Sequence, residues 1–355
     1  MLDNIVKPLV EWYEENHRIL PWREAKNPYY IWISEIMLQQ TRVEAVKPYF
    51  QRFIQELPTV EDVSDYPEEQ LLKLWEGLGY YNRVRNIQKA AIQIVEQYGG
   101  NLPADYELLK KLPGIGNYTA GAVASIAYDI PVPAVDGNVL RVISRITESY
   151  EDILKQSVKT KVENELLEII PKENPGVFNQ ALMELGAMVC LPNGAPKCEI
   201  CPVADLCQAK ANQTVMELPV KKKAKARRLE PKTVIVLRDG DRVAIRKRPA
   251  KGLLAGLYEL PNVEGHITEE ELLVWLKKYD VLPLQIKKLE DSKHIFSHVE
   301  WNMIGYMIRV AQLDVEKEQD LIFAETVDIE KNYPVPVAFS AYASYMNMKL
   351  GINNK

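Results

Sequence analysis

The spacing of hydrophobic residues changes once along this chain of 355 residues, and the change divides it into two parts. In residues 1–210 apolar residues recur at intervals of three and four, which is the spacing of amphipathic helices. From about residue 232 they alternate with polar residues, as in strands that bury one face. The two patterns predict an all-α domain over 1–210 and an α+β domain over 232–355.

Nine helices are predicted in the first part, with Pro and Gly between them. They cover residues 3–13, 30–38, 43–54, 68–76, 84–97, 118–127, 138–146, 158–170 and 177–189. The segment 211–231 is polar and strongly basic, and we interpret it as an interdomain linker. Its basic residues are Lys221, Lys222, Lys223, Lys225, Arg227 and Arg228.

Strands and helices are both predicted in the second part. Asp239-Gly240 lies between two alternating runs, which is typical of a β-hairpin. Thr268, followed by a glutamate three residues later, is typical of a helix N-terminus. The predicted strands are Thr233–Leu237, Arg242–Arg246, Leu284–Leu289 and His298–Val310, and the predicted helices are Thr268–Tyr279 and Ala338–Met348.

Charge and hydropathy restrict where the protein acts. No run of about 18 apolar residues is present, so no membrane span is expected, and the N-terminus lacks a signal-peptide pattern. We therefore expect a cytoplasmic protein. The net charge of −5 does not favour a nucleic-acid partner. However, Arg83, Arg85 and Lys89 form a basic group, as does the linker, and local basic surfaces are compatible with DNA binding.

The run Leu112-Pro113-Gly114-Ile115-Gly116 predicts a tight turn that opens a helix. Backbone N–H groups exposed at such a turn, together with the helix dipole, bind phosphate. Twenty residues after Gly116 stands Asp136, inside Pro133-Ala134-Val135-Asp136-Gly137-Asn138. An ordinary glycine turn, with Asp136 only capping the next helix, is the alternative interpretation.

All four cysteines lie in one window, at Cys190, Cys198, Cys201 and Cys207. Four thiols in one loop of a cytoplasmic protein favour a single metal centre over disulfides. Only one Cys-x-x-Cys pair is present, and Pro202 follows it directly. This pattern favours a [4Fe-4S] cluster over a zinc ion.

Glu35 is the single acid in the apolar helical run 31–38. Burial in such a run would raise the pKa of its carboxyl and keep it protonated as a general acid. Asp136 would lie among backbone N–H donors at a helix start and remain ionised. Two carboxyls whose pKa values differ in this way are what cleavage of a glycosidic bond requires. The alternative is a surface glutamate and a capping aspartate.

These motifs together resemble a known family. The helix-hairpin-helix at 112–116, Asp136 and the four-cysteine loop resemble base-excision DNA glycosylases of the endonuclease III superfamily. Glu35 within Ser-Glu-Ile-Met-Leu-Gln-Gln-Thr, together with Leu20-Pro21-Trp22-Arg23, resembles the adenine glycosylase branch, the MutY type. The resemblance covers nearly the whole chain. It implies a six-helix barrel module and a cluster module, with double-stranded DNA bound between them.

The resemblance also implies a reaction, in which adenine opposite 8-oxoguanine or guanine is flipped out of the duplex. Glu35 would protonate the adenine and Asp136 would stabilise the cationic sugar, with Tyr118 and Asn138 in support. Because Tyr118 replaces the lysine of bifunctional relatives, a monofunctional glycosylase is expected. The implied DNA contacts are Gln40, Thr41, Leu78, Tyr80, Leu112, Gly114 and Gly116, of which Gln40 and Tyr80 resemble wedges that enter the base stack.

The second part resembles a Nudix-like fold through residues 252–261, but it lacks the Arg-Glu-x-x-Glu-Glu helix that would bind magnesium. We therefore interpret it as a recognition domain. Phe296-Ser297-His298 matches the loop that senses 8-oxoguanine in the family; the alternative is a strand-entry turn with a buried histidine.

One feature departs from the family pattern. Seven residues separate Cys190 from Cys198, whereas much of the family has six. Two other functions fit part of the sequence. A thymine-mismatch glycosylase can also carry tyrosine at position 118, and a non-catalytic DNA-binding protein can keep the fold. A monomer is the expected oligomeric state.

Overall fold

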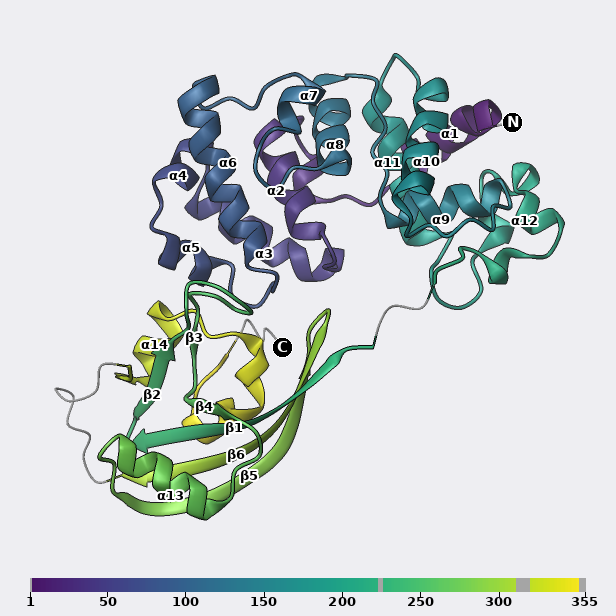
Figure 1. Ribbon diagram of the computed structural model, residues 1–355. Helices are drawn as coiled ribbons and strands as arrows, with labels where there is room; N and C mark the ends of the chain where they lie inside the picture. The colour runs from purple at the N-terminus through teal and green to yellow at the C-terminus, as the bar shows by residue number, and fades with distance from the viewer. Residues whose placement is uncertain (1, 223–225, 311–319, 351–355) are drawn as a thin grey trace. The chain divides into compact units, whose positions relative to one another are not determined.

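The computed structural model describes residues 2–222, 226–310 and 320–350, and they form two compact units (Figure 1). The first unit contains residues up to 65 and from 86 to 222. The second contains residues 66–85 together with the described residues from 226 onward. The short segment 66–85 therefore belongs to the second unit, although its sequence position lies within the predicted all-α domain.

The first unit is helical, as its hydrophobic spacing predicts. Each of the nine predicted segments overlaps a helix, one of which, α5 (Glu68–Leu74), lies in the second unit. The helix α6 (Asn82–Tyr98) begins in the second unit and continues into the first. The other α-helices of the first unit are α1 (Val6–Asn16), α2 (Pro28–Leu38), α3 (Val43–Glu56), α4 (Val60–Asp65), α7 (Tyr106–Leu109), α8 (Asn117–Tyr128), α9 (Gly137–Ile146), α10 (Gln156–Ile169), α11 (Pro175–Met188) and α12 (Gln208–Ala211).

Two of these helices begin at side chains that cap them. Asn27 accepts hydrogen bonds from the backbone N–H groups of Tyr29 and Tyr30 and so starts α2, with Pro28 in its first turn. Asp136 caps α9 in the same way. The position of each helix start is therefore set locally by the sequence.

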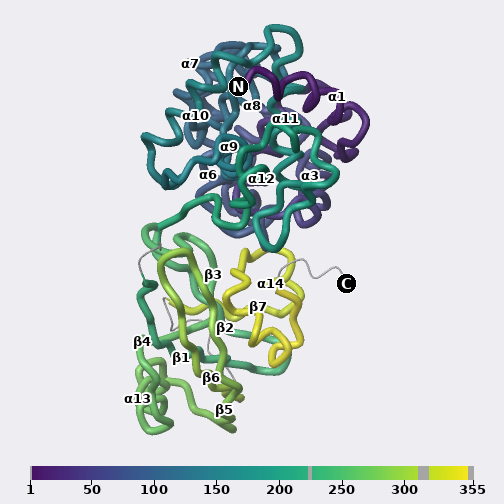
Figure 2. Tube along the Cα trace, turned by 90° about the vertical axis from the view of Figure 1, so that its right-hand side faces the viewer, coloured from purple at the N-terminus to yellow at the C-terminus, as the bar shows by residue number. Residues whose placement is uncertain are grey.

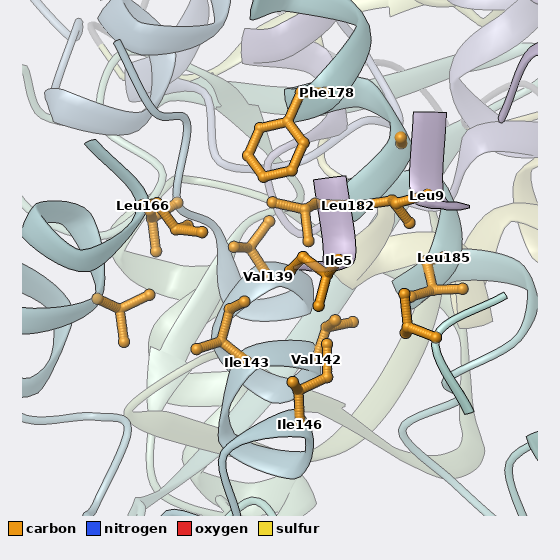
Figure 3. Packing of buried hydrophobic residues seen from close by; sticks show 14 of the residues in the cluster. Ile5, Leu9, Val139, Val142, Ile143, Ile146, Leu166, Phe178, Leu182 and Leu185 are labelled. Atoms are coloured by element: carbon orange, nitrogen blue, oxygen red, sulfur yellow. The ribbon is translucent and has the colours of Figure 1, made fainter. Parts of the chain in front are cut away.

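A hydrophobic core holds α9 between α1, α10 and α11. Figure 3 shows Ile5 and Leu9 from the N-terminal helices in contact range of the α9 residues and of Phe178 and Leu182 on α11. Nearly every residue of α9 is buried. The N-terminus of α9, with Asp136, is thus held by a packed core rather than by a loop.

Among its described residues, the second unit contains a mixed sheet of seven strands in which β6 pairs with β5 and with β1, a pairing that can be followed in Figure 2. The main path is β3-β2-β1-β6-β5, with β4 against β1 and β7 against β2. The pair β1–β6 is parallel and the others are antiparallel. The strands are β1 (Arg228–Asp239), β2 (Arg242–Lys247), β3 (Tyr258–Glu259), β4 (Asn262–Glu264), β5 (Pro283–Ile295), β6 (Val299–Val310) and β7 (Ile322–Glu325).

Both faces of this sheet are covered. One face of β1 packs Val234 and Val236 against Phe339 and Tyr342, and the other packs against α13 (Glu269–Lys278). The helix α14 (Thr326–Asn332) completes the unit. Burial on both faces explains why 234–237 is a continuous apolar run.

Several predictions for this unit are confirmed and one is corrected. The hairpin pairs Asp239 with Arg242, and Thr268 and Glu271 form a capping box. The segment 211–231 was interpreted as a linker, but its last residues are part of the sheet. Strand β1 begins at Arg228, which pairs with Val299. Lys223 and Lys225 lie outside the described residues.

The predicted final helix is present and is a 3₁₀ helix, Val337–Met346. Phe339 and Tyr342 are three residues apart and both fully buried, which suits three residues per turn. Over ten residues, hydrophobic spacing does not separate the two helix types. Among the described residues, no helix is long and apolar enough to cross a membrane.

Candidate active site

A cavity of about 820 Å³ lies in the first unit. It is lined by side chains from α2, α8 and α11 and by the start of α9. Four residues predicted as catalytic line it together, and so do two predicted DNA contacts. These six residues are Glu35, Tyr118, Asp136, Asn138, Gln40 and Thr41.

Glu35 lies on the buried side of α2 and is 6% exposed. Burial raises the pKa of its carboxyl to about 7. The hydroxyl of Tyr118 donates a hydrogen bond of 2.5 Å to Oε2 of Glu35, which opposes this rise, whereas the nearby charge of Asp136 adds to it. Near neutral pH, Glu35 is therefore present in both its acid and its base form.

Asp136 accepts three hydrogen bonds at the start of α9. Its Oδ1 accepts from the backbone N–H groups of Asn138 and Val139, each at 2.8 Å, and its Oδ2 accepts from the side-chain amide of Asn138 at 2.7 Å. The sequence predicted the backbone donors but not the depth of burial, which raises the pKa of Asp136 above its usual value. The three donors oppose this rise and favour the ionised form.

Arg141 connects Asn138 to the cysteine loop. Its guanidinium donates to the Asn138 side-chain oxygen at 3.0 Å, to the Gly186 carbonyl at 2.8 Å and to the Cys190 carbonyl at 2.9 Å. The contact requires α9 and α11 to approach closely. A Cβ atom at Gly186 would lie 2.7 Å from the Cβ atom of Asn138.

A buried ion cluster, which the sequence analysis missed, lies at the same cavity. Glu184 on α11 is 1% exposed and accepts from the guanidinium groups of Arg18 and Arg23 at 2.7–3.0 Å. These two arginines lower the pKa of Glu184 to about 2 despite its burial. Glu184 is a lone acid in an apolar helix, which is the same sequence signal that singled out Glu35.

The four cysteines, none of which forms a disulfide, line one hollow between α9, the end of α11 and the loop 190–207. Arg145 is 4% exposed and donates to the Sγ atom of Cys190 at 3.2 Å. Burial raises the pKa of the Cys201 thiol to about 11. Within the described residues, no three His, Cys, Asp or Glu side chains converge as they would around a single metal ion.

The predicted hairpin is present and precedes α8. Gly114 has a φ of +78°, a conformation that glycine adopts without strain. At Gly116, which caps α8, a Cβ atom would meet nothing within 4 Å, so the surface there is open. Leu112 is 2% exposed, and any contact it makes with DNA would involve its backbone.

The remaining predicted residues lie in the second unit. Tyr80 is 46% exposed, which excludes the core-packing alternative, and its hydroxyl lies 3.5 Å from Oγ of Ser297. Ser297 and His298 are exposed, so the interpretation of His298 as a buried histidine is wrong. Phe296 packs edge-on against Trp301.

Leu78 lies two residues before Tyr80 but, unlike Tyr80, it is buried. Only 6% of Leu78 is exposed, and its carbonyl accepts a hydrogen bond from the Arg83 guanidinium. The side chain of Leu78 is therefore part of the packing under the turn.

Comparison with known proteins identifies the family. Residues 33–172 match the HhH-GPD superfamily of base excision DNA repair proteins, and residues 233–344 match the NUDIX domain. An adenine DNA glycosylase of Buchnera aphidicola (from Schizaphis graminum) is 35% identical, over 85% of this chain and 87% of that protein. The chain belongs to the adenine DNA glycosylase family.

Relatives from distant organisms give the same result. The adenine DNA glycosylase of Schizosaccharomyces pombe is 30% identical over 96% of this chain and 89% of its own length. That of Rattus norvegicus is 34% identical over 82% of this chain and 68% of its own length. The family that the sequence motifs resembled is therefore confirmed over most of the chain.

Solved structures resemble the helical part. A complex of endonuclease III with DNA has a TM-score of 0.52 and 29% identity, and it covers 60% of this chain and 96% of its own. A thermostable thymine-DNA glycosylase has a TM-score of 0.52 and 28% identity, and it covers 59% of this chain and 96% of its own. The predicted helix-hairpin-helix glycosylase fold, joined to a Nudix-like domain, is thus confirmed.

Proposed function

We propose that this protein hydrolyses the N-glycosidic bond of adenine mispaired with 8-oxoguanine or guanine in double-stranded DNA. The observation that carries the proposal is that Glu35 and Asp136 line one cavity, where the pKa of Glu35 is raised to about 7. A protonatable carboxyl beside an ionised one is the arrangement that cleaves glycosidic bonds.

In the proposed reaction, adenine is flipped out of the duplex and enters the cavity. The neutral carboxyl of Glu35 donates its proton to N7 of adenine, which makes the base a better leaving group. As the bond breaks, positive charge develops on the sugar, and the carboxylate of Asp136 stabilises it. The carboxylate of Glu35 then takes a proton from the attacking water.

Tyr118 and Asn138 are proposed to hold these two acids in place. Tyr118 donates to Glu35, and burial raises the pKa of the phenol well above its usual value, so the hydroxyl remains a neutral donor. A phenol does not form a Schiff base with the sugar. We therefore propose a monofunctional glycosylase that leaves the DNA strand intact.

Recognition of DNA is assigned to four segments of the chain. The hairpin 112–116 is proposed to bind backbone phosphate through its N–H groups. Gln40 has a φ of +60° and Tyr80 one of +48°, and both are proposed to act as wedges in the base stack. Ser297 and His298 are proposed to contact the Hoogsteen edge of 8-oxoguanine, with Phe296 supporting their loop.

Cys190, Cys198, Cys201 and Cys207 are proposed to hold a [4Fe-4S] cluster. All four thiols line one hollow, as the ligands of a single group would. Arg141 and Arg145 are buried beside the loop, and their positive charges match the negative charge of a thiolate-ligated cluster. The cluster would hold loop 190–207 in its folded form.

The partner of the proposed enzyme is double-stranded DNA, bound by a monomer. The proposed domains are a glycosylase domain over 1–210 and a lesion-recognition domain over 232–355, joined by the basic segment 211–231, whose end enters the sheet at Arg228. Residues 66–85 belong to the compact unit of the lesion-recognition domain. The site of action is the cytoplasm, on the nucleoid DNA.

A panel of duplexes with single defined mispairs tests the proposed reaction. Cleavage by alkali and heat after incubation should appear at adenine opposite 8-oxoguanine, more slowly at adenine opposite guanine, and without alkali at neither. Faster loss of thymine from guanine·thymine pairs would instead support a thymine glycosylase. Binding without loss of any base would support a non-catalytic DNA-binding protein.

A further inference from the structure

The segment 66–85 is held to the rest of the second unit by polar side chains from α5 and from the turn that follows it. Glu69 accepts hydrogen bonds from the hydroxyl of Tyr258 and, at 3.2 Å, from the ammonium of Lys247. Lys73 follows four residues later on the same helix face, and Glu76 stands one turn further. Nothing in the hydrophobic spacing of the segment signals this polar face.

Lys73 caps the C-terminal end of α14. Its Nζ atom donates to the carbonyl of Tyr333 at 3.0 Å, to that of Ile329 at 3.3 Å and to Oε2 of Glu76 at 2.7 Å. The Lys73 side chain is 16% exposed. A cation near the last carbonyls of a helix is favoured by the negative end of the helix dipole.

Glu76 completes the contact. Its Oε1 atom accepts from the backbone N–H of Val335 at 2.7 Å, and its side chain is 12% exposed. The ion pair of Lys73 and Glu76 thus binds three main-chain groups between 329 and 335. Because main-chain groups have fixed positions in the unit, this contact fixes the segment in one register.

The turn that carries Tyr80 follows directly. Gly79 and Tyr80 have φ values of +70° and +48°, and the indole N–H of Trp75 donates to the Gly79 carbonyl at 3.1 Å. The hydroxyl of Tyr80 lies 3.5 Å from Oγ of Ser297. The wedge and the lesion-sensing serine therefore meet within one compact unit, on segments far apart in sequence.

We infer that Lys73 and Glu76 are positioning residues for recognition of the base opposite adenine. They hold Tyr80 beside Ser297, so that the contact of Ser297 with 8-oxoguanine and the insertion of Tyr80 into the base stack are coupled. This inference rests on the proposed function, because it takes Tyr80 as the wedge and Ser297 as the contact to 8-oxoguanine.

Single-turnover excision from duplexes with 8-oxoguanine·adenine and guanine·adenine tests the inference. In Lys73→Met the preference for 8-oxoguanine should fall about tenfold, while the rate constant on guanine·adenine changes by less than about twofold. Lys73→Arg keeps donors that reach both carbonyls and should restore the preference. Lys7→Met removes an exposed lysine from another helical Lys–Glu pair and should have no effect.

A second readout reports on the wedge itself. The fluorescence of 2-aminopurine placed beside the opposite base rises when the stack is opened. It should rise less with Lys73→Met than with the parent enzyme, at saturating protein. A variant that lost only stability would lower activity on both duplexes equally and leave this signal unchanged, and that result would overturn the inference.

The failures of the two hypotheses are distinguishable. If Ser297→Ala and Tyr80→Ala lose the preference but Lys73→Met and Glu76→Ala keep it, only the positioning role is wrong. If Ser297→Ala and Tyr80→Ala keep it, the proposed recognition residues are wrong, and the positioning role falls with them. If Lys73→Met does not fold, Glu76→Ala tests the positioning role instead, because in that variant the ammonium of Lys73 can still bind the carbonyls of Ile329 and Tyr333.

Discussion

The carboxyl of Glu35 loses most of its hydration on α2, and the phenol of Tyr118 supplies one hydrogen bond in return. The resulting pKa of about 7 sets the expected pH dependence. The carboxyl of Glu35 is deprotonated as pH rises through 7. The single-turnover rate constant should therefore fall by up to about tenfold for each pH unit above 7. Excision measured between about pH 5.5 and 9 checks this, and a rate that rises through pH 7 would contradict it.

Replacing Glu35 with Gln keeps the shape of the side chain and removes the proton it donates. Excision of adenine should fall at least about a hundredfold, since general acid catalysis contributes about that much or more. Binding of the mispaired duplex, followed by gel shift, should stay within a few-fold of the parent protein. An unchanged excision rate would remove Glu35 from the proposed mechanism.

Glu184 makes a different contribution, because it is paired rather than left neutral. Glu184→Gln leaves Arg18 and Arg23 without their buried counter-charge and should lower the free energy of unfolding by about 3 kcal/mol. Its pKa is lowered to about 2, so this stabilisation is complete above the unfolded pKa of about 4.5 and is lost as pH falls toward 2. Urea unfolding at pH 7 and at pH 3 should show a difference between parent and variant that is smaller at pH 3.

Sequence reasoning found Glu35 but not Glu184, although both are lone acids in apolar helices. The sequence near Glu35 contains the family motif, which supplied the distinction. The partners of Glu184 lie about 160 residues away in the chain, and no local pattern links them to it. The spacing of residues predicts which side chains are buried, whereas tertiary contacts decide whether a buried acid is neutral or paired.

At the level of helices, the approach of α11 to α9 sets the position of the residues around Asp136. Gly186→Ala would place a Cβ atom 2.7 Å from that of Asn138, so the two helices must shift. Excision should fall about tenfold, through displacement of Asn138 and Arg141.

The helices and most strands were predicted from hydrophobic spacing and caps, as at Asn27 and Thr268, because these signals are local. The pairing of β1 with β6 was not, since the paired residues of these parallel strands lie 71 positions apart in the chain and leave no turn signal between them. The 3₁₀ form of 337–346 was also missed, because its pattern over ten residues equals that of an α-helix.

Across the whole molecule, the cysteine loop is connected to the proposed catalytic residues through Cys190, Arg141 and Asn138. Removal of iron, or Cys198→Ser, should therefore lower both the thermal stability and the rate of adenine excision. The parent protein should show broad visible absorption, and iron and sulfide analysis should give about four of each per chain. Colourless, fully active protein containing zinc would contradict the cluster assignment.

The placement of residues 66–85 in the second unit was beyond sequence analysis. Residues 66–85 have the helical spacing of their neighbours, and tertiary contacts, such as those of Glu69, Lys73 and Arg85, place them in the second unit. Hydrophobic periodicity reports on which face of a helix is buried. It does not indicate which of the two units that face packs against.

The backbone passes from one compact unit to the other at 65–66, at 85–86 and again after 222. The two units are therefore not two continuous stretches of sequence. A protease that cut only after residue 222 would leave a fragment carrying α5 with its polar face exposed to water. Joining only the residues from 226 onward to another glycosylase would likewise transfer one side of the interface with 66–85 and leave the other side behind. Exchange between relatives would have to replace 66–85 and the Nudix-like part as a matched pair.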